Sequence, residues 1–210
     1  AYGEHGAIVH YSADEKSNVP LKEGKLFMTD TGGHYLEGST DITRTIALGE
    51  VGNIEKEHFT LVARAMLRLA NTVFLYGCSG ANLDCIAREV FWKEGLNFNH
   101  GTGHGVGYLL NIHEGPINFR WKEGERPAPA LEENMVITDE PGIYIEGSHG
   151  IRLENELLVR KTVKNEYGQF MNFEILTYVP IDLDAILPEK MSTEEKEMLN
   201  HYHKQVYEKV

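Results

Sequence analysis

Two periodicities of apolar residues divide the chain into α and β segments. After Asn53, the predicted N-cap, apolar side chains recur at the three- and four-residue spacing of a long amphipathic helix that ends at Gly77. A second helix carries its apolar stripe from Leu83 to Phe91 and has a left-handed terminator at Gly95. The pattern therefore predicts two consecutive helices in the first half of the chain.

Short apolar or alternating runs on both sides of these helices predict strands. The runs cover, in chain order, residues 7–11, 26–28, 41–46, 134–138, 143–145, 152–159 and 173–178. The pairs 32–33 and 37–38 contain glycine and are turn signals. A capping box of Ser192 and Glu195 opens a last helix through Tyr207. The order β, α, α, β, α is typical of an α+β domain whose helices cover one face of a curved antiparallel sheet.

The length and composition are sufficient for one continuous core, because the chain has 210 residues and 41% of them are hydrophobic. We expect a catalytic domain over residues 1–180 and a C-terminal helical segment over 181–210 that packs on it. The chain has no initiator Met, so an N-terminal part is expected to have been removed. Cys78 and Cys85 lack the spacing of a metal or redox pair and are expected to be core thiols.

The charge of the chain restricts its partners. Thirty-two acidic residues against twenty basic ones give a net charge of −12, which repels nucleic acids and anionic membranes. No run reaches the about 18 apolar residues of a membrane span, and no signal segment opens the sequence. We therefore expect small molecules, peptides or proteins as partners, no nucleic acid or membrane, and a cytoplasmic location.

Two aspartates stand at the ends of apolar runs, where a charge is costly. Asp30 follows the run 26–28, and Asp41 begins the next run. In a hairpin the two carboxylates could face each other, and half-buried like charges repel unless they share a cation or one is protonated. Taken alone, either aspartate is better explained by an N-cap or a turn.

A glycine-rich segment, residues 100–107, places His100 and His104 four residues apart. Four glycines exclude the helical zinc-protease arrangement of two histidines, but they allow backbone and substrate to approach a histidine closely. His113 follows in the run 111–116, just before a turn. Each histidine alone is equally compatible with a structural role.

Glu140 caps the run 134–138, and Glu154 lies in the run 152–159 between Arg152 and Glu156. Strand alternation places these last three side chains on one face, which an exposed strand face would also explain. The occurrence of four such carboxylates and a histidine in one chain is better explained by a metal site; these residues are Asp30, Asp41, His104, Glu140 and Glu154. Four carboxylates balance two divalent ions, bridging carboxylates hold such ions about 3.5–4 Å apart, and water between them becomes a nucleophile at neutral pH.

The motifs resemble those of the pita-bread metallopeptidases and, within them, the Xaa-Pro aminopeptidases. The matching segments are residues 29–32, 39–45, 100–107, 111–116, 138–142 and 150–155, with the tail 173–180 and 199–203. The resemblance implies a pita-bread α+β fold. Family members carry N-terminal domains and first helices that this chain lacks, so it looks like a fragment of the catalytic domain.

The resemblance also implies roles for individual residues. It makes Asp30, Asp41, His104, Glu140 and Glu154 the ligands of two metal ions, with Asp41 and Glu154 bridging. It makes Glu140 the group that accepts and returns a proton. It makes His10, His100 and His113 the histidines that bind substrate and stabilise charge. Arg152 looks like the arginine that supports the ligands.

We therefore predict an aminopeptidase that releases the first residue of peptides with proline in second position. Manganese is the metal that the resemblance suggests, although the ligand set also accepts Zn²⁺ or Co²⁺. The full-length protein is expected to be a homodimer. The alternatives are a prolidase that accepts only Xaa-Pro dipeptides, a metal-free creatinase-like hydrolase, and an inactive pita-bread module that binds peptides.

Overall fold

The computed structural model describes residues 1–122, 124 and 127–209, and it shows an antiparallel β-sheet with helices on one side. The helices are α1 (Asn53–Ala70), α2 (Gly80–Trp92) and α3 (Thr193–Lys209). The strands are β1 (Lys25–Tyr35), β2 (Gly38–Leu48), β3 (Phe74–Leu75), β4 (Gly103–Val106), β5 (His113–Phe119), β6 (Val136–Asp139), β7 (Gly142–Ile145), β8 (His149–Arg152), β9 (Asn155–Asn165) and β10 (Gly168–Ile175). Short 3₁₀ turns cover Gly3–Ala7, Leu183–Ala185 and Pro188–Lys190.

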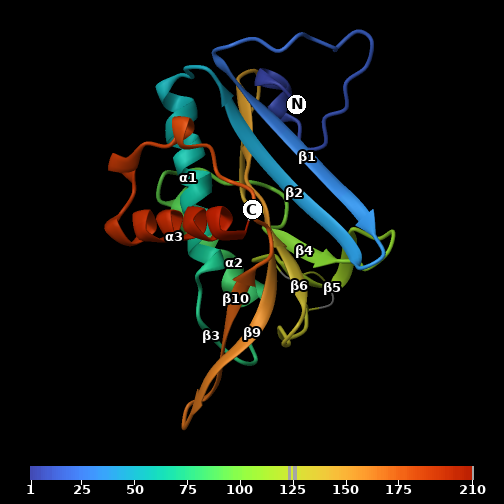
Figure 1. Cartoon of the computed structure of the whole chain (residues 1–210), viewed down its shortest axis with the longest axis vertical. Helices are drawn as coiled ribbons and strands as arrows, with labels where there is room; N and C mark the ends of the chain where they lie inside the picture. The colour runs from blue at the N-terminus through green and yellow to red at the C-terminus, as the bar shows by residue number, and fades with distance from the viewer. Residues whose placement is uncertain (123, 125–126, 210) are drawn as a thin grey trace.

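Six strands form the main sheet in the order β3-β10-β9-β6-β4-β5, and two hairpins, β1–β2 and β7–β8, complete the β structure. Figure 1 shows the three helices together on one side of β9 and β10, with the long β1–β2 hairpin on the other. This arrangement confirms the predicted α+β class and its curved antiparallel sheet. Within the described residues, no helix is both long and apolar enough to cross a bilayer.

Helix α1 forms the centre of the hydrophobic core. Its residues Phe59, Val62, Met66 and Leu69 are completely buried, and the helix packs against α2, α3 and several strands. Burial of this kind contributes roughly 1.5–3 kcal/mol for each large apolar side chain. The core therefore fixes the sheet on which the polar strand ends are placed.

Both central helices were predicted correctly, but the first one ends earlier than its apolar pattern suggests. Gly52 rather than Asn53 is its N-cap, and it ends at Ala70. Phe74 instead pairs with Met171 of β10. Tertiary pairing with the sheet therefore overrides the helical periodicity at its C-terminal end.

Gly32-Gly33 is not a turn, which corrects the prediction. Both glycines lie inside β1, and Gly32 pairs with Asp41 of β2. A Cβ atom on Gly32 would lie 2.2 Å from the carbonyl oxygen of Thr40, so this glycine permits close approach of the two strands. The chain reverses later, just before Gly38, at the second of the two predicted turns.

The predicted strand over residues 7–11 is also wrong. Its first residue, Ala7, ends a 3₁₀ turn, and the segment continues as turn and coil; the preceding Gly6 packs directly on the backbone of Gly150. The predicted strand over 152–159 is interrupted at Leu153 and Glu154. Strands β4 and β5 were not predicted, since the glycines in and before them hide the alternation.

The two cysteines are free thiols, but only one of them touches the core. Cys78 is half-buried against the hydrophobic cluster, whereas Cys85 is exposed on α2. The prediction of two core thiols is wrong for Cys85, because its neighbour Asp84 occupies the buried face of the helix.

The predicted capping box at the start of α3 is present. The Ser192 hydroxyl accepts a hydrogen bond from the Glu195 amide (3.1 Å), and the Glu195 carboxylate accepts one from the Ser192 amide (2.9 Å). Replacing Ser192→Ala should therefore lower the free energy of unfolding by about 1 kcal/mol. Urea titration measures this change, with Glu197→Ala on the exposed face of α3 as control. Equal stability of the Ser192→Ala variant and the wild type would contradict the role of the cap.

Candidate metal centre

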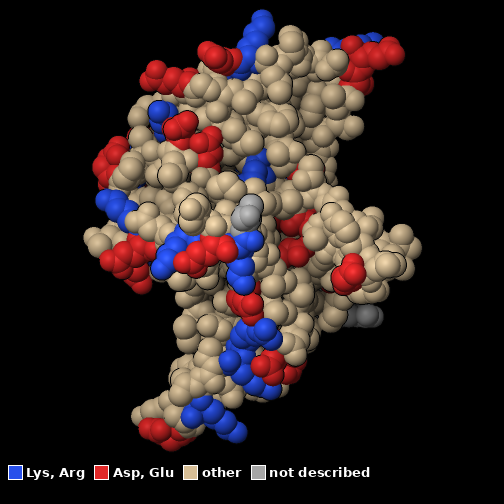
Figure 2. Space-filling view, in the orientation of Figure 1, with Lys and Arg blue, Asp and Glu red and all other residues tan. Residues whose placement is uncertain are grey.

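Five acidic or imidazole side chains converge on one cavity of about 350 Å³. They come from separate parts of the chain: Asp30 from β1, Asp41 from β2, His104 from β4, Glu140 from the end of β6, and Glu154 from the interruption between β8 and β9. Figure 2 shows acidic side chains recessed in a hollow near the middle of this face. The fold therefore brings together all five residues predicted to be ligands, and their assignment as ligands stays a prediction.

The ligand atoms of these residues fall into overlapping groups. Within each group, all atoms lie within 4.8 Å of one another. The groups are Asp30, Asp41 and Glu154; His104, Glu140 and Glu154; and Asp41, His104 and His113. Asp41, His104 and Glu154 each belong to two groups, and for the two carboxylates this is the arrangement expected of ligands that lie between two cations.

His104 is oriented so that one ring nitrogen faces the carboxylates. Its Nδ1 lies 2.9 Å from the Gly105 carbonyl oxygen, which can only accept a hydrogen bond, so Nδ1 carries the proton in the neutral ring. The free Nε2 lies 3.2 Å from Glu140 Oε1 and 3.6 Å from Asp41 Oδ2. This is the tautomer that a metal-binding histidine adopts.

Hydroxyl groups support the carboxylates from behind. Thr43 Oγ1 donates to Glu154 Oε2 (2.8 Å), and Thr138 Oγ1 donates to Glu140 Oε1 (3.1 Å). These threonines were not identified from the sequence. Each lies two residues from a candidate ligand on the same strand or at its end, Thr43 from Asp41 and Thr138 from Glu140, so strand alternation could have indicated them.

Arg152 binds beside the carboxylates rather than on the protein surface. Its guanidinium donates to Asp30 Oδ2 (2.6 Å), Thr43 Oγ1 (3.1 Å) and the Tyr144 hydroxyl (3.1 Å). Arg152, Glu154 and Glu156 are at most 7% exposed, so the alternative of an exposed strand face is wrong. These three side chains lie in a desolvated environment where pairing is required.

The remaining predicted histidines occupy two positions. His10 and His113 line the cavity, and the His113 ring is 4.3 Å from that of His104. His100 does not line it, because its Nδ1 donates to the Gly101 carbonyl oxygen and its Nε2 lies 2.8 Å from the Tyr144 hydroxyl. Tyr144 therefore connects His100 to Arg152, a link that the sequence did not indicate.

Burial and repulsion raise the pKa values of two carboxyl groups in the cavity, whereas cationic neighbours lower the pKa of a third. Burial, with repulsion from Glu140 and Asp41, raises the pKa of Glu154 well above its usual value. Burial and the Asp30 carboxylate likewise raise the pKa of Asp41. Burial is the largest influence on Glu140 as well, but hydrogen bonding and charge attraction from the protonated His104 ring, with attraction from His100 and Arg152, together outweigh it and lower the pKa of Glu140. The oxygen-rich donor set with one imidazole fits divalent transition ions, which would neutralise this repulsion.

The curved antiparallel sheet gathers four carboxylates and a histidine in one cavity, a donor set that is typical of sites for divalent metal ions. Residues 1–161 match the model of metallopeptidase family M24, and residues 169–210 match the C-terminal region of peptidase M24. The chain belongs to metallopeptidase family M24, and its fold is the predicted pita-bread fold.

Curated relatives carry the same name in several fungi. "Probable Xaa-Pro aminopeptidase P" of Aspergillus flavus is 40% identical over 99% of this chain, and that of Paracoccidioides brasiliensis is 39% identical. The matches span 32% and 34% of those proteins. The chain therefore spans about a third of the length of these relatives.

Solved structures agree with this likeness. The X-prolyl aminopeptidase of Caenorhabditis elegans, described as a cytosolic enzyme with a di-nuclear active site, is 39% identical with a TM-score of 0.91 over 98% of this chain and 33% of its own. The prolidase of Pyrococcus furiosus is 34% identical with a TM-score of 0.67 over 84% of this chain and 47% of its own.

The raised pKa of Glu154 predicts how stability of the metal-free protein depends on pH. The folded state keeps this proton to a higher pH than the unfolded state does, so this contribution to stability falls as pH rises above the unfolded pKa. Glu154→Gln should therefore stabilise the metal-free protein at pH 8 by on the order of 1 kcal/mol, with little effect near pH 4. Urea titration in the presence of a chelator measures the difference.

The control for that measurement is Glu166→Gln, which removes one carboxylate from the exposed β9–β10 turn. It should leave the pH dependence of stability unchanged. A Glu154→Gln variant that is less stable than wild type at pH 8 would show that Glu154 is ionised and well paired without metal.

Proposed function

We propose that this chain forms the catalytic centre of a dinuclear metal-dependent Xaa-Pro aminopeptidase. The observation that carries the proposal is the sharing of Asp41 and Glu154 between overlapping groups of ligand atoms in one cavity. Relatives of that name match almost the whole chain, which supports the same activity. The reaction is removal of the first residue from a peptide whose second residue is proline.

Two sets of side chains would hold the ions. Asp30, Asp41 and Glu154 would bind one ion, and His104, Glu140 and Glu154, with Asp41, the other. When bound, the two ions supply a water nucleophile at neutral pH and polarise the scissile carbonyl group. Manganese is our preferred metal, and zinc or cobalt would suit the same donors.

The protein supplies proton transfer and charge stabilisation around the ions. Glu140 Oε2 accepts a proton from the nucleophile and returns it to the leaving amine, because this carboxylate lines the cavity and its lowered pKa favours the ionised form. His113 and His10 line the cavity and donate hydrogen bonds to the substrate carbonyl and its developing charge. His100 acts through Tyr144, whose hydroxyl it holds in place.

The acidic cavity also suits the free amino terminus of a peptide. The amino terminus would sit against one of the ions and an acidic side chain that lines the cavity, so cleavage releases the first residue. The C. elegans relative is described as cytosolic, which supports a cytoplasmic location for this protein as well.

A prolidase is the second candidate, since prolidases are among the similar solved structures. The two enzymes differ in substrate length. Hydrolysis of Xaa-Pro-Yaa tripeptides by the full-length protein is the expected result, whereas hydrolysis of Xaa-Pro dipeptides alone would favour the prolidase.

Replacing Asp41→Ala or Glu154→Ala in the full-length protein should remove both bound metal and turnover, because each carboxylate is shared by two groups of ligand atoms. Elemental analysis after dialysis and an Xaa-Pro-Yaa assay measure the two losses. An active variant without metal would contradict the proposed function.

Replacing His113→Ala should lower kcat by about 10²–10³-fold while both metals stay bound, because a donor to the developing charge is lost. The matched control is His201→Ala on the exposed face of α3, which should leave kcat unchanged. A normal kcat for His113→Ala would exclude His113 from the reaction.

A further inference from the structure

Arg44 is a buried cation on the side of β2 that faces away from the metal cavity. It is 5% exposed, and strand alternation places it opposite Asp41 and Thr43. Every hydrogen bond that it makes within the described part of the chain ends on a carbonyl, amide or hydroxyl oxygen, and none ends on a carboxylate. A buried guanidinium without an acidic partner is costly, so its retention requires an explanation.

One end of the guanidinium joins β2 to the backbone of Glu154. Nη1 donates to the carbonyl oxygens of Thr43 (3.0 Å) and Glu154 (2.5 Å), and the Glu154 amide donates to the Thr43 carbonyl oxygen (3.0 Å). These bonds are located at the interruption between β8 and β9, where Glu154 belongs to neither strand. Arg44 thus holds the backbone of Glu154 against the strand that carries Asp41.

The same contact fixes the side chain of Glu154 indirectly. Thr43, whose carbonyl oxygen accepts from Arg44, donates its hydroxyl to Glu154 Oε2. Displacing the Arg44 side chain would therefore loosen both the backbone of Glu154 and the hydroxyl that orients its carboxylate. A shift of one carboxylate that belongs to two ligand groups changes both groups at once.

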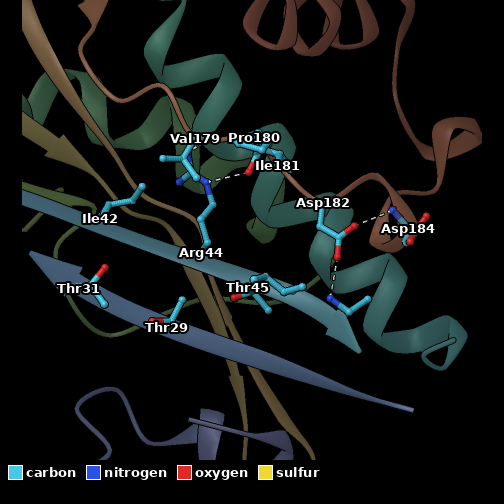
Figure 3. Close-up of a pocket in the computed structure, with 12 residues that line it drawn as sticks. Thr29, Thr31, Ile42, Arg44, Thr45, Val179, Pro180, Ile181, Asp182 and Asp184 are labelled. Carbon is cyan, nitrogen blue, oxygen red and sulfur yellow. Dashed lines mark hydrogen bonds between the residues drawn. The ribbon is translucent and has the colours of Figure 1, made fainter. Parts of the chain in front are cut away.

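The other end of the guanidinium binds the C-terminal segment. Nη2 donates to Val179 O (2.8 Å), Asn155 Oδ1 (2.7 Å) and the hydroxyl of Tyr202 (2.7 Å), and Nε donates to Pro180 O (3.2 Å). Figure 3 shows Arg44 extending from the hairpin toward Val179 and Pro180. Tyr202 lies on α3 and is 1% exposed, so the helix reaches Arg44 through a dry contact.

Lysine cannot replace this arrangement. The acceptors surround a planar group from several directions, and an ammonium has three donors where the guanidinium has five. Position 44 therefore requires the planar guanidinium of arginine, because a positive charge alone would not satisfy these acceptors.

We propose that Arg44 is a positioning residue for the metal centre: it fixes Glu154 relative to Asp41, and Tyr202 couples α3 to that geometry. The inference rests on the proposed function, because it assigns Arg44 a role toward ions held by those two carboxylates. Neither Arg44 nor Tyr202 lines the metal cavity, so their effect passes through Glu154.

The test compares Arg44→Met, Arg44→Lys and Tyr202→Phe with wild type in the full-length protein. Mn²⁺ titration by calorimetry measures stoichiometry and affinity, and electron paramagnetic resonance detects coupling between two Mn²⁺ ions. Both Arg44 variants should bind the second Mn²⁺ at least about tenfold more weakly and lose the coupled signal. Tyr202→Phe should also weaken binding of the second Mn²⁺, by a smaller factor.

The matched control is Arg64→Met, which removes the Arg64–Glu195 ion pair (2.9 Å) between α1 and α3. It should lower the unfolding midpoint without changing Mn²⁺ affinity, which separates loss of stability from loss of positioning. At saturating Mn²⁺, kcat of the Arg44 variants should fall while KM stays close to wild type.

Wild-type Mn²⁺ affinity and coupling in Arg44→Lys and Tyr202→Phe would overturn the inference, even if Arg44→Met did not fold. Equal weakening of Mn²⁺ binding in Arg64→Met would overturn it as well, because the effect would then follow stability. A wild-type protein that binds fewer than two Mn²⁺ would instead refute the proposed function, and the role of Arg44 with it.

Discussion

Repulsion among four carboxylates in one partly buried cavity is the constraint on which the rest of the site depends. Burial is the largest cause of the raised pKa values of Glu154 and Asp41, and repulsion from neighbouring carboxylates adds to both shifts. Two doubly charged ions would remove this repulsion and add an attraction that the apoprotein lacks. The donor hydroxyls and Arg152 reduce the repulsion only in part, since each hydroxyl binds one carboxylate oxygen and Arg152 hydrogen-bonds to Asp30 alone among the four carboxylates, with Glu140 Oε2 4.0 Å away.

The fold concentrates these charges by ending or interrupting strands at one place. Asp30 and Asp41 are brought together because Gly32 lets β1 and β2 approach closely. Glu154 enters the cavity because the chain leaves the strand ladder between β8 and β9. The apolar core around α1 packs beneath these irregularities, and a small number of hydrogen bonds outside the strand ladders positions the candidate ligands.

Local signals were sufficient for the features that local chemistry determines. Helix α2 and the capping box at Ser192 were identified from residue type and spacing, and the five candidate ligands from the resemblance of their motifs to the pita-bread metallopeptidases. Features set by distant partners were not predicted. Phe74 pairs with β10 instead of continuing the predicted helix, and Gly32 lies in a close strand contact instead of the predicted turn. Arg44 and Tyr144 carry no local pattern, because their importance comes from partners up to 158 residues away.

The central claim is that the cavity holds two ions between these five side chains. Anomalous diffraction from crystals of the full-length protein grown with Mn²⁺ tests it most directly. Two peaks are predicted, with Asp41 and Glu154 between them, Asp30 on one side, and His104 with Glu140 on the other. The absence of a peak from the cavity, or a single peak contacting other residues, would contradict the claim.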